Sequence, residues 1–440
     1  MKTIRALGIA ALIVTAGCDS DGIERPPPTT VHVFNAASNI ASVAVLREEI
    51  LLIETNYAGG TQQTFDSGPY DFHLQTLPVG SFLSERVLTF REDLGPRRDN
   101  LFVILARDGE PEVFVSSTEE FSADTGTARW TLFHAFDGLG DLDVYVEPAD
   151  TDLTQAVPRG RIAFATPLTF EFAIALPRLY LTAPGDPTSI IFESLGQDVL
   201  PNTSEVLVIS DPGNQGSYDI LVSRVRANTG RLAQEGQQSA VRMINLTEDR
   251  TARDVYLDDT TEPPLLAAFA YGELTPYLVV EPTQHSIIST PVDNPGTVEG
   301  QVGWFATPGR VFTVFLTGDA STGITHNIVA EDNRSLDGEV SLQIISGATL
   351  FAQHEVFIVD PGTDITTVNA TVTLQPPAFT QRLRLLPGDY ELFVRDDLTD
   401  AVIAGPEPLS MGDGGVYSLI LSNSLDGSTV DAELIEDFVP

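Results

Sequence analysis

Apolar and polar residues alternate over short segments along most of this chain, and turn residues interrupt the alternation at roughly ten-residue intervals. Thr30–Phe34 alternates polar and apolar side chains, which predicts a strand with one buried and one solvent-facing side. Leu101–Leu105 is apolar at every position, which indicates a strand inside a core. No segment has the length and period of a long amphipathic helix, and the pattern therefore predicts an all-β protein.

The alternating segments recur as four similar blocks of roughly a hundred residues. Each block contains an opening strand, a strand with an acid followed by Val and an aromatic residue, a central hairpin and a late apolar strand. We expect immunoglobulin-like β-sandwiches in tandem at 30–118, 128–225, 239–330 and 338–440. The joints 116–127, 223–238 and 331–338 are polar, which favours separately cored sandwiches along a rod. The opening strands end at Val33-Phe34-Asn35-Ala36, Leu132-Phe133-His134-Ala135, Met243-Ile244-Asn245-Leu246 and Ile344-Ile345-Ser346-Gly347.

The N-terminus has the features of an export signal. Lys2 and Arg5 precede the apolar run Ala6–Ala16, which is too short to span a bilayer, since spanning needs roughly 20 residues. Small residues directly before Cys18 resemble the lipobox of bacterial lipoproteins, in which the signal is cleaved before the cysteine and the cysteine is acylated. We therefore expect residues 1–17 to be a signal peptide and 18–30 a lipidated, proline-rich tether, although an ordinary signal peptide remains an alternative.

Short motifs within the blocks resemble the domain of unknown function numbered 4397. The strands Asp143-Val144-Tyr145-Val146 and Asp254-Val255-Tyr256-Leu257 match its second element, and Leu386-Pro387-Gly388-Asp389-Tyr390 matches its Gly-containing turn. Block one departs from this pattern at Ser42-Val43-Ala44-Val45, which lacks the acid and the aromatic residue, but Gly68-Pro69-Tyr70 keeps the turn. The resemblance implies an exported bacterial β domain, often in tandem, and it carries no known activity.

The composition excludes several kinds of chemistry. The formal net charge of −38 argues against nucleic acid as a partner and is typical of a highly soluble protein. Lys2 is the sole lysine, and hence the exported part has neither a Schiff-base lysine nor a phosphate-loop lysine. Cys18 is the sole cysteine, which excludes disulfides and thiol catalysis in the exported domains.

Few residues point to a catalytic or metal site. His354-Glu355 begins like a zinc-protease motif, but Ile358 occupies the position of the second histidine. Asp137, Asp141 and Asp143 lie close together around two glycines and are candidate calcium ligands, so calcium is the one cofactor that we consider. Solvated turn acids are the simpler interpretation of this group, and of a second group at Asp396, Asp397 and Asp400. Trp130 and Trp304 could stack on a sugar, although core packing is favoured for both.

Together these features predict a lipid-anchored, extracytoplasmic protein of the bacterial cell envelope. We expect a structural or binding role, such as adhesion or scaffolding, with the membrane as one partner through Cys18 and an unidentified protein or glycan as another. The polar residue at the end of each opening strand, such as His134, is expected to hydrogen-bond a turn and not to catalyse a reaction. We do not expect an enzyme. The alternatives are a calcium-dependent or carbohydrate-binding adhesive module and an envelope hydrolase with its site in one domain.

Overall fold

The computed structural model describes residues 25–437 apart from 39, 41, 77–78, 80–83, 108–109, 122–125, 174, 213–219, 227–229, 332 and 337. Within these residues the fold is almost entirely β, with one short 3₁₀ helix, η1 (Asp137–Leu139). The all-β prediction is therefore confirmed. No helix among the described residues has the length and apolar character needed to cross a membrane.

Each sequence block forms two facing sheets, and every sheet contains strands of one block only. In the first block, sandwich 1, one sheet has the order β4-β1-β7-β8 and the other the order β3-β2-β5-β6. We call these the opening-strand sheet and the second-strand sheet. The strands of sandwich 1 are β1 (Pro28–Asn35), β2 (Ser42–Arg47), β3 (Ile50–Asn56), β4 (Gly60–Asp66), β5 (Gly68–Thr76), β6 (Glu85–Leu94), β7 (Arg98–Arg107) and β8 (Glu110–Glu119).

Sandwich 2 repeats this arrangement with the sheets β12-β9-β15-β16-β17 and β11-β10-β13-β14. Its opening-strand sheet gains a short fifth strand from the joint that leads to sandwich 3. The strands are β9 (Ala128–His134), β10 (Leu142–Glu147), β11 (Gly160–Ile162), β12 (Pro167–Phe172), β13 (Arg178–Ala183), β14 (Asp186–Glu193), β15 (Ser204–Ser210), β16 (Leu221–Val225) and β17 (Gly230–Arg231).

Sandwich 3 has the sheets β21-β18-β24-β25 and β20-β19-β22-β23. Its long late strand β24 continues the apolar pattern seen in the sequence. The strands are β18 (Ser239–Asn245), β19 (Arg253–Leu257), β20 (Leu266–Phe269), β21 (Leu278–Val280), β22 (Gln284–Pro291), β23 (Gly300–Phe305), β24 (Val311–Asp319) and β25 (Gly323–Ala330).

Sandwich 4 has the sheets β29-β26-β33-β34 and β28-β27-β31-β32, and β30 also pairs with β26. The strand that follows β28 is thus split into two short pieces along one edge. The strands are β26 (Val340–Ser346), β27 (His354–Val359), β28 (Val372–Leu374), β29 (Ala378–Phe379), β30 (Leu383–Leu385), β31 (Gly388–Asp396), β32 (Val402–Met411), β33 (Val416–Asn423) and β34 (Val430–Glu436).

The four sandwiches share one strand order and one register. The opening strand pairs in parallel with the late apolar strand, while its other neighbour is antiparallel. This detail refines the immunoglobulin-like expectation, because an immunoglobulin constant domain places its first strand beside the second. The residue that ends the opening strand lies opposite the same late-strand position each time: Asn35↔Ile104, His134↔Ile209, Asn245↔Leu316 and Ser346↔Leu421.

Each sandwich has its own core between its two sheets. The opening strands are nevertheless buried on both sides, whereas Thr30–Phe34 was predicted to be half-buried. Every residue of β9, β18 and β26 is buried, and so is His32 in β1. The outer face of each opening-strand sheet must therefore be covered by another part of the molecule.

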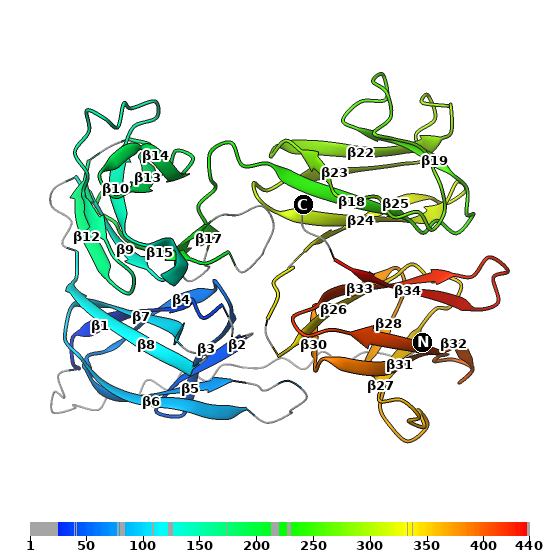
Figure 1. The fold of residues 1–440 in the computed structure, drawn as a ribbon, viewed down its shortest axis with the longest axis horizontal. Helices are drawn as coiled ribbons and strands as arrows, with labels where there is room; N and C mark the ends of the chain where they lie inside the picture. The colour runs from blue at the N-terminus through cyan, green and yellow to red at the C-terminus, as the bar shows by residue number, and fades with distance from the viewer. Residues whose placement is uncertain are drawn as a thin grey trace, which may run out of the picture.

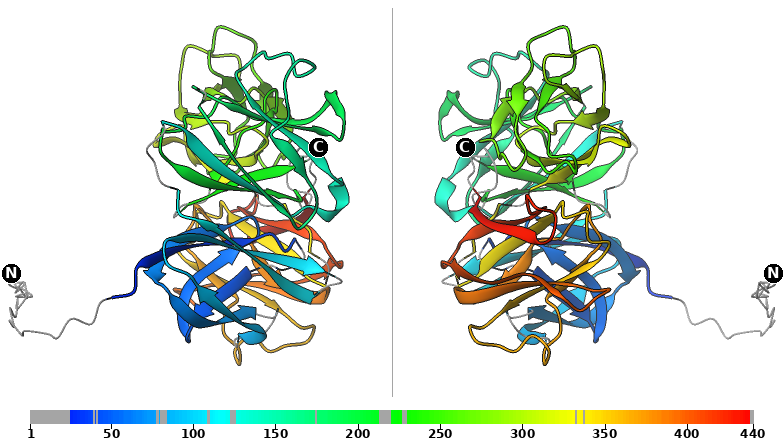
Figure 2. Two further views of the ribbon diagram at one scale, coloured as in Figure 1. Left: turned by 90° about the vertical axis from the view of Figure 1, so that its left-hand side faces the viewer. Right: turned by 90° about the vertical axis from the view of Figure 1, so that its right-hand side faces the viewer.

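The covering layer is the opening-strand sheet of a neighbouring sandwich. Phe34 and Val103 of sandwich 1 pack against Phe133 and Val208 of sandwich 2 in one shared apolar cluster. Sandwiches 3 and 4 share a second such cluster. The chain thus forms two pairs that lie side by side, each with its two sandwiches stacked (Figures 1 and 2). The expected rod is wrong, because apolar residues on the outer faces fold the tandem back on itself.

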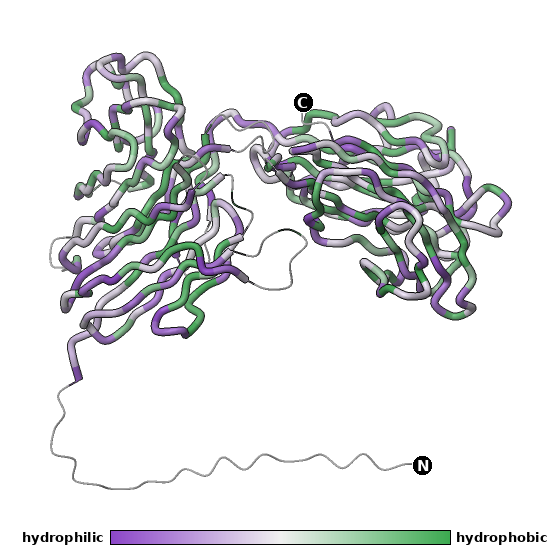
Figure 3. The backbone as a smooth tube through the Cα atoms, turned by 60° about the horizontal axis from the view of Figure 1, so that its bottom comes forward, coloured by the Kyte–Doolittle hydropathy of each residue, from purple (hydrophilic) through white to green (hydrophobic). Residues whose placement is uncertain are grey.

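Apolar and polar segments alternate along the chain in both pairs (Figure 3). This distribution fits several separate cores between sheets better than one central core. The joint 331–338 is not the exposed polar linker that its composition predicted. Glu331, Asn333, Arg334 and Leu336 are all buried. The joint between sandwiches 3 and 4 is therefore part of the packed interior of the molecule.

Candidate functional site

The polar residue that ends each opening strand has the same role in all four sandwiches. Its side chain accepts a hydrogen bond from the backbone N–H two residues later, which ends the strand in a local turn. The bonds are Ala37 N to Asn35 Oδ1 at 3.1 Å, Phe136 N to His134 Nδ1 at 3.2 Å, Thr247 N to Asn245 Oδ1 at 3.1 Å and Ala348 N to Ser346 Oγ at 3.4 Å. The predicted turn role of these residues is confirmed.

His134 illustrates why this position is structural. Its Nδ1 accepts from Phe136, so the neutral ring carries its proton on Nε2 and donates to the carbonyl of Gly140 at 2.7 Å. Burial lowers the pKa of His134, which favours this neutral form. Both ring nitrogens are thus occupied by the backbone, and neither is free to move a proton to a substrate.

The three candidate calcium ligands do not converge. Asp143 receives two bonds from the guanidinium of Arg161, at 2.8 and 3.2 Å, and one from the backbone N–H of Gly185 at 2.6 Å. The hydrogen bond from Arg161 is the main reason that the pKa of Asp143 is lowered. Asp137, the first residue of η1, and Asp141, which follows this helix, are both exposed. An arginine-paired carboxylate is a poor calcium ligand, and this geometry argues against the predicted site.

Two acids of the second group are engaged by other side chains. Asp396 accepts from the hydroxyl of Thr399 at 2.5 Å, and Asp397 accepts from the side chain of Gln353 at 2.7 Å. Across the part of the chain that the structure describes, no group of three His, Cys, Asp or Glu side chains could hold a metal ion.

Both tryptophans are buried in sandwich cores. Trp130 donates from Nε1 to Glu205 at 2.9 Å and packs edge-on against Phe172. Trp304 lies against Phe312. Neither ring is available to stack on a sugar, and the expectation of core packing is confirmed.

Two buried serine–histidine pairs are the nearest approach to a nucleophilic site. Ser289 Oγ lies 2.7 Å from His326 Nε2, and Ser346 Oγ lies 3.2 Å from His354 Nε2. Burial lowers the pKa of each histidine to about 4. Nδ1 of both rings is buried without a hydrogen-bond partner, so neither pair has the carboxylate that completes a catalytic triad.

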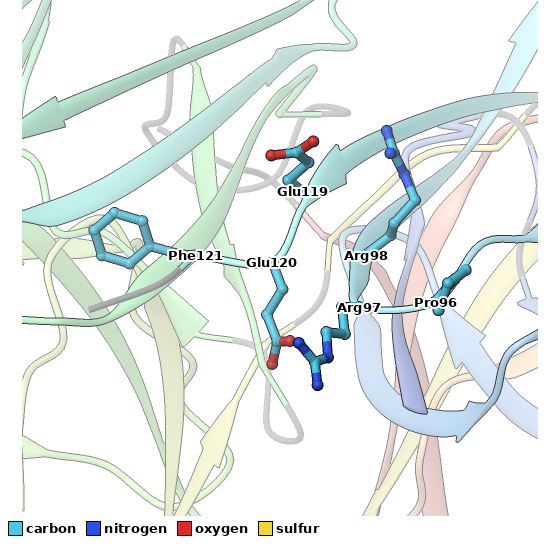
Figure 4. Close-up of a pocket in the computed structure, with 6 residues that line it drawn as sticks. All are labelled: Pro96, Arg97, Arg98, Glu119, Glu120 and Phe121. Atoms are coloured by element: carbon cyan, nitrogen blue, oxygen red, sulfur yellow. The ribbon is translucent and has the colours of Figure 1, made fainter. Parts of the chain in front are cut away.

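A polar depression of about 560 Å³ lies where sandwich 1 meets the joint to sandwich 2. Two arginines and two glutamates line it, and Figure 4 shows Arg97 and Glu120 pointing toward each other. Arg98 is held by Ser117 at 2.7 Å. Arg129 of sandwich 2 reaches the same joint, bonding Asp99 at 3.1 Å and lying over the ring of Phe121. These contacts brace the joint, and the mixed charges show no preference for one ligand.

A buried ionic cluster joins sandwiches 3 and 4. The guanidinium of Arg242 lies 2.7 Å from Asp437 and 3.2 Å from Glu331, and that of Arg382 lies 2.7 Å from both carboxylates. The side chains of both acids are inaccessible to solvent. We did not expect this cluster from the sequence. The sequence feature that could have predicted the cluster is Arg242 within the apolar opening strand, because a buried charge requires a partner of opposite charge.

Two tyrosines link the sandwiches of each pair at equivalent places. The hydroxyl of Tyr57 in sandwich 1 donates to the carbonyl of Asp211, directly after β15 of sandwich 2. The hydroxyl of Tyr271 in sandwich 3 donates to the carbonyl of Asn423 at the end of β33, at 2.7 Å. The two pairs are therefore built alike, and no local sequence pattern predicts such a contact. Cys18, the predicted lipidation site, lies outside the described residues.

Comparison with known proteins gives a family for one part of the chain. No curated protein matches the sequence. Among solved structures, the Bacillus anthracis TIE protein is 8% identical with a TM-score of 0.18; the alignment covers 86% of this chain and 65% of that one. A carbohydrate-binding module of family CBM26 from Eubacterium rectale Amy13K, solved with maltoheptaose, is 11% identical with a TM-score of 0.15; the alignment covers 46% of this chain and 95% of the module.

The family match spans residues 239–352, which is all of sandwich 3 and the opening strand of sandwich 4. It includes Asp254-Val255-Tyr256-Leu257, one of the motifs on which the resemblance was predicted. Residues 239–352 match the model of the family described as Domain of unknown function (DUF4397).

Proposed function

We propose that this protein is a lipid-anchored, extracytoplasmic binding or scaffold protein of the bacterial cell envelope. Residues 1–17 are removed as a signal peptide, Cys18 carries the lipid, and the following segment tethers the folded part to the membrane. The two sandwich pairs then present their loops and junctions to a partner outside the cytoplasm.

One observation carries the binding role. The polar residues that recur in all four sandwiches serve the backbone, as the four strand-end bonds demonstrate. A catalytic site that had been copied with the domains would be expected at such equivalent positions. What varies between sandwiches is the surface at their junctions, and variable surfaces on a repeated framework favour recognition over catalysis.

The attachment of the first sandwich fits a tether that leads into it. The carbonyl of Pro27 accepts from Ser67 N at 3.0 Å, and that of Pro28 accepts from Arg97 N at 2.9 Å. The chain is therefore fixed to the sandwich at the second and third of its three consecutive prolines. A pull on the tether would load the backbone of β1, which is hydrogen-bonded on both sides.

Replacement of Cys18 tests the anchoring. The full chain and its Cys18→Ser variant are expressed in a bacterial host with radiolabelled palmitate. We expect label in the wild-type chain and partition into the detergent phase, and neither in the variant. A variant that still partitions with membranes would contradict the lipid anchor.

Capture from the native envelope tests the binding role. The Cys18→Ser variant, immobilised, should retain one defined protein or glycan from a native envelope extract. Glycan cleavage by the same purified variant would instead favour a hydrolase.

A further inference from the structure

The two sandwich pairs differ in the surroundings of the equivalent tyrosines. Tyr57 and Tyr271 each precede a residue with positive φ, Ala58 at 54° and Gly272 at 76°. The N–H of that residue donates to the carbonyl of the strand-end residue, Asn35 or Asn245, at 2.8 Å in both cases. The same local structure thus holds the two tyrosines, and the surroundings of the two rings can be compared directly.

Tyr57 is covered by an arginine from the other pair. The guanidinium of Arg334, in the joint between sandwiches 3 and 4, lies 4.9 Å from the centre of the ring. It also donates to the carbonyl of Ile40 at 3.5 Å. Arg334 is 2% exposed. The molecule therefore already contains an arginine, supplied by a remote segment, that is bound over this tyrosine.

Beside Tyr271 the nearby arginine comes from the same sandwich, since the guanidinium of Arg250 lies 6.0 Å from the centre of the ring, and a cleft remains open next to it. A cleft of about 450 Å³ lies there between sandwiches 3 and 4, where β34 approaches sandwich 3 (Figure 1). Its volume is in the range of small ligand sites. Ile244, Leu246 and Ile420 line it together with Tyr271, and Asp431 and Glu433 add two carboxylates.

Two substitutions distinguish the lining of this cleft from the equivalent place in the first pair. Phe34 in sandwich 1 corresponds to Ile244 in sandwich 3, as the residue before the strand-end asparagine. Leu221 in sandwich 2 corresponds to Asp431 in sandwich 4, because each pairs with the serine after the matched late-strand position. The first pair fills this space with buried Phe34 and Leu221. The second pair has a smaller side chain and a charged one instead.

We propose that the cleft beside Tyr271 binds an arginine-bearing segment of a cationic partner protein. The aliphatic stem of the arginine lies on Ile244 and Ile420, and its guanidinium reaches Asp431, Glu433 and the tyrosine ring. Arg334 on Tyr57 supplies the internal precedent for this mode of binding. The net charge of −38 attracts a basic partner from a distance. This site gives a location and a partner class to the binding role proposed above, on which it rests.

A matched pair of peptides tests the site. The full chain is titrated into a fluorescein-labelled peptide, acetyl-Gly-Leu-Arg-Leu-Arg-Leu-Gly, and into the same peptide with citrulline in place of arginine. Citrulline keeps the shape of arginine and removes its charge. Fluorescence anisotropy at about 50 mM and about 150 mM salt measures the affinity and its electrostatic part. We expect the arginine peptide to bind at least tenfold more tightly than the citrulline peptide.

Variants separate the cleft from the overall charge. Asp431→Asn with Glu433→Gln should weaken arginine-peptide binding at least tenfold. Glu54→Gln with Glu262→Gln, which removes the same charge from exposed positions elsewhere, should change it less than twofold. Asp431→Leu with Ile244→Phe, which copies the filled arrangement of the first pair, should abolish binding without lowering the melting temperature.

Equal losses in the two charge variants, or equal affinity for the two peptides, would overturn the proposal, and so would the absence of binding by the wild-type chain. These outcomes leave the binding role itself open, because envelope capture through another face would still succeed. Failure of the Cys18 experiment, in turn, has no bearing on the peptide titration.

Discussion

At the residue scale, one turn with positive φ recurs beside the end of the opening strand. The residue that donates to the carbonyl of the strand-end residue has positive φ in three sandwiches, as Ala58 at 54°, Ala165 at 54° and Gly272 at 76°. Only glycine adopts this conformation without cost, since a Cβ approaches the following carbonyl oxygen. Sandwich 3 uses glycine, and the other two accept the strain in exchange for an alanine that packs in the junction between sandwiches.

Gly272→Ala should destabilise sandwich 3 by about 1 kcal/mol. A Cβ at Gly272 would meet no atom within 4 Å, so the loss would come from the backbone alone. Thermal unfolding of the full chain should show a lower melting temperature for the transition of sandwich 3. Ala165→Gly is the matched control, in which relief of strain opposes loss of packing, and it should change stability less. An unchanged melting temperature for Gly272→Ala would contradict this assignment of strain.

His326 should make the protein acid-sensitive. Burial lowers its pKa from 6.5 to about 4, so the unfolded chain binds a proton at higher pH than the folded one. The contribution of neutral His326 to the free energy of unfolding is therefore complete above pH 6.5, and it is lost as the pH falls from 6.5 through about 4. By linkage this loss amounts to about 3 kcal/mol. Other buried histidines with lowered pKa, His32 and His354, add to the effect.

His326→Gln tests this contribution, since glutamine keeps a hydrogen-bonding group and cannot be protonated. The difference in melting temperature between pH 7 and pH 4.5 should be smaller in the variant than in the wild type. Ser289→Ala, which removes the partner and keeps the imidazole, should retain the full acid sensitivity. The proposal about His326 fails if His326→Gln loses as much stability at low pH as the wild type.

At the element scale, the strand pattern was predictable and its surroundings were not. The late strands, such as Leu101–Leu105, were identified as buried because an apolar run without alternation needs cover on both sides. The opening strand Thr30–Phe34 was predicted to be half-buried, since His32 and its polar neighbours alternate with apolar residues. The side chain of Arg242 is instead buried, where it donates to Thr313, to Glu331 and to Ser418 of the adjoining sandwich. Alternation of polar and apolar residues shows that successive side chains point to opposite faces of the sheet. It does not show which face is exposed to solvent.

The candidate sites show the same limit. The strand-end positions were identifiable because four copies align in one sequence, and a local bond two residues away satisfies each of them. The ionic cluster of Arg242 and Asp437 joins residues from the two sandwiches of a pair, so no spacing rule connects them. Sequence periodicity contains information about neighbours along one strand and none about contacts between domains.

Among the strand-end residues, Asn245 should cause the largest loss of stability when it is replaced by alanine. Its side chain accepts from Thr247 N at 3.1 Å, and it donates to the carbonyls of Thr251 and Phe269 at 3.1 and 2.9 Å. Asn245→Ala leaves these buried groups without partners and should cost about 3 kcal/mol. Ser346→Ala removes a bond of 3.4 Å to the backbone and the contact of 3.2 Å with the buried Nε2 of His354, so the loss there should be about 2 kcal/mol. Denaturant midpoints measure both, and equal losses would contradict the comparison.

At the scale of the whole molecule, the chain is a duplicated pair. Each pair buries two opening-strand sheets against each other, with an equivalent tyrosine contact across the junction. The first junction is mainly apolar, while the second combines a smaller apolar cluster with the ionic cluster of Arg242. Domains joined by extensive apolar junctions are not expected to move independently, so the rigid unit is the pair and not the sandwich. Relative motion is then expected between pairs.

Arg334 should hold the two pairs together, because it belongs to the joint between sandwiches 3 and 4 and its guanidinium lies over Tyr57 of sandwich 1. Arg334→Ala removes the cation–π contact and the bond to Ile40, and should lower the melting temperature and increase the radius of gyration in solution scattering. Arg250→Ala is the matched control, since Arg250 lies 6.0 Å from the centre of the equivalent Tyr271 ring within a single pair. It should leave the radius of gyration unchanged. If the radius of gyration of Arg334→Ala equals that of the wild type, other contacts hold the pairs together. Burial of the joint 331–338 would then serve only to place Glu331 in the ionic cluster.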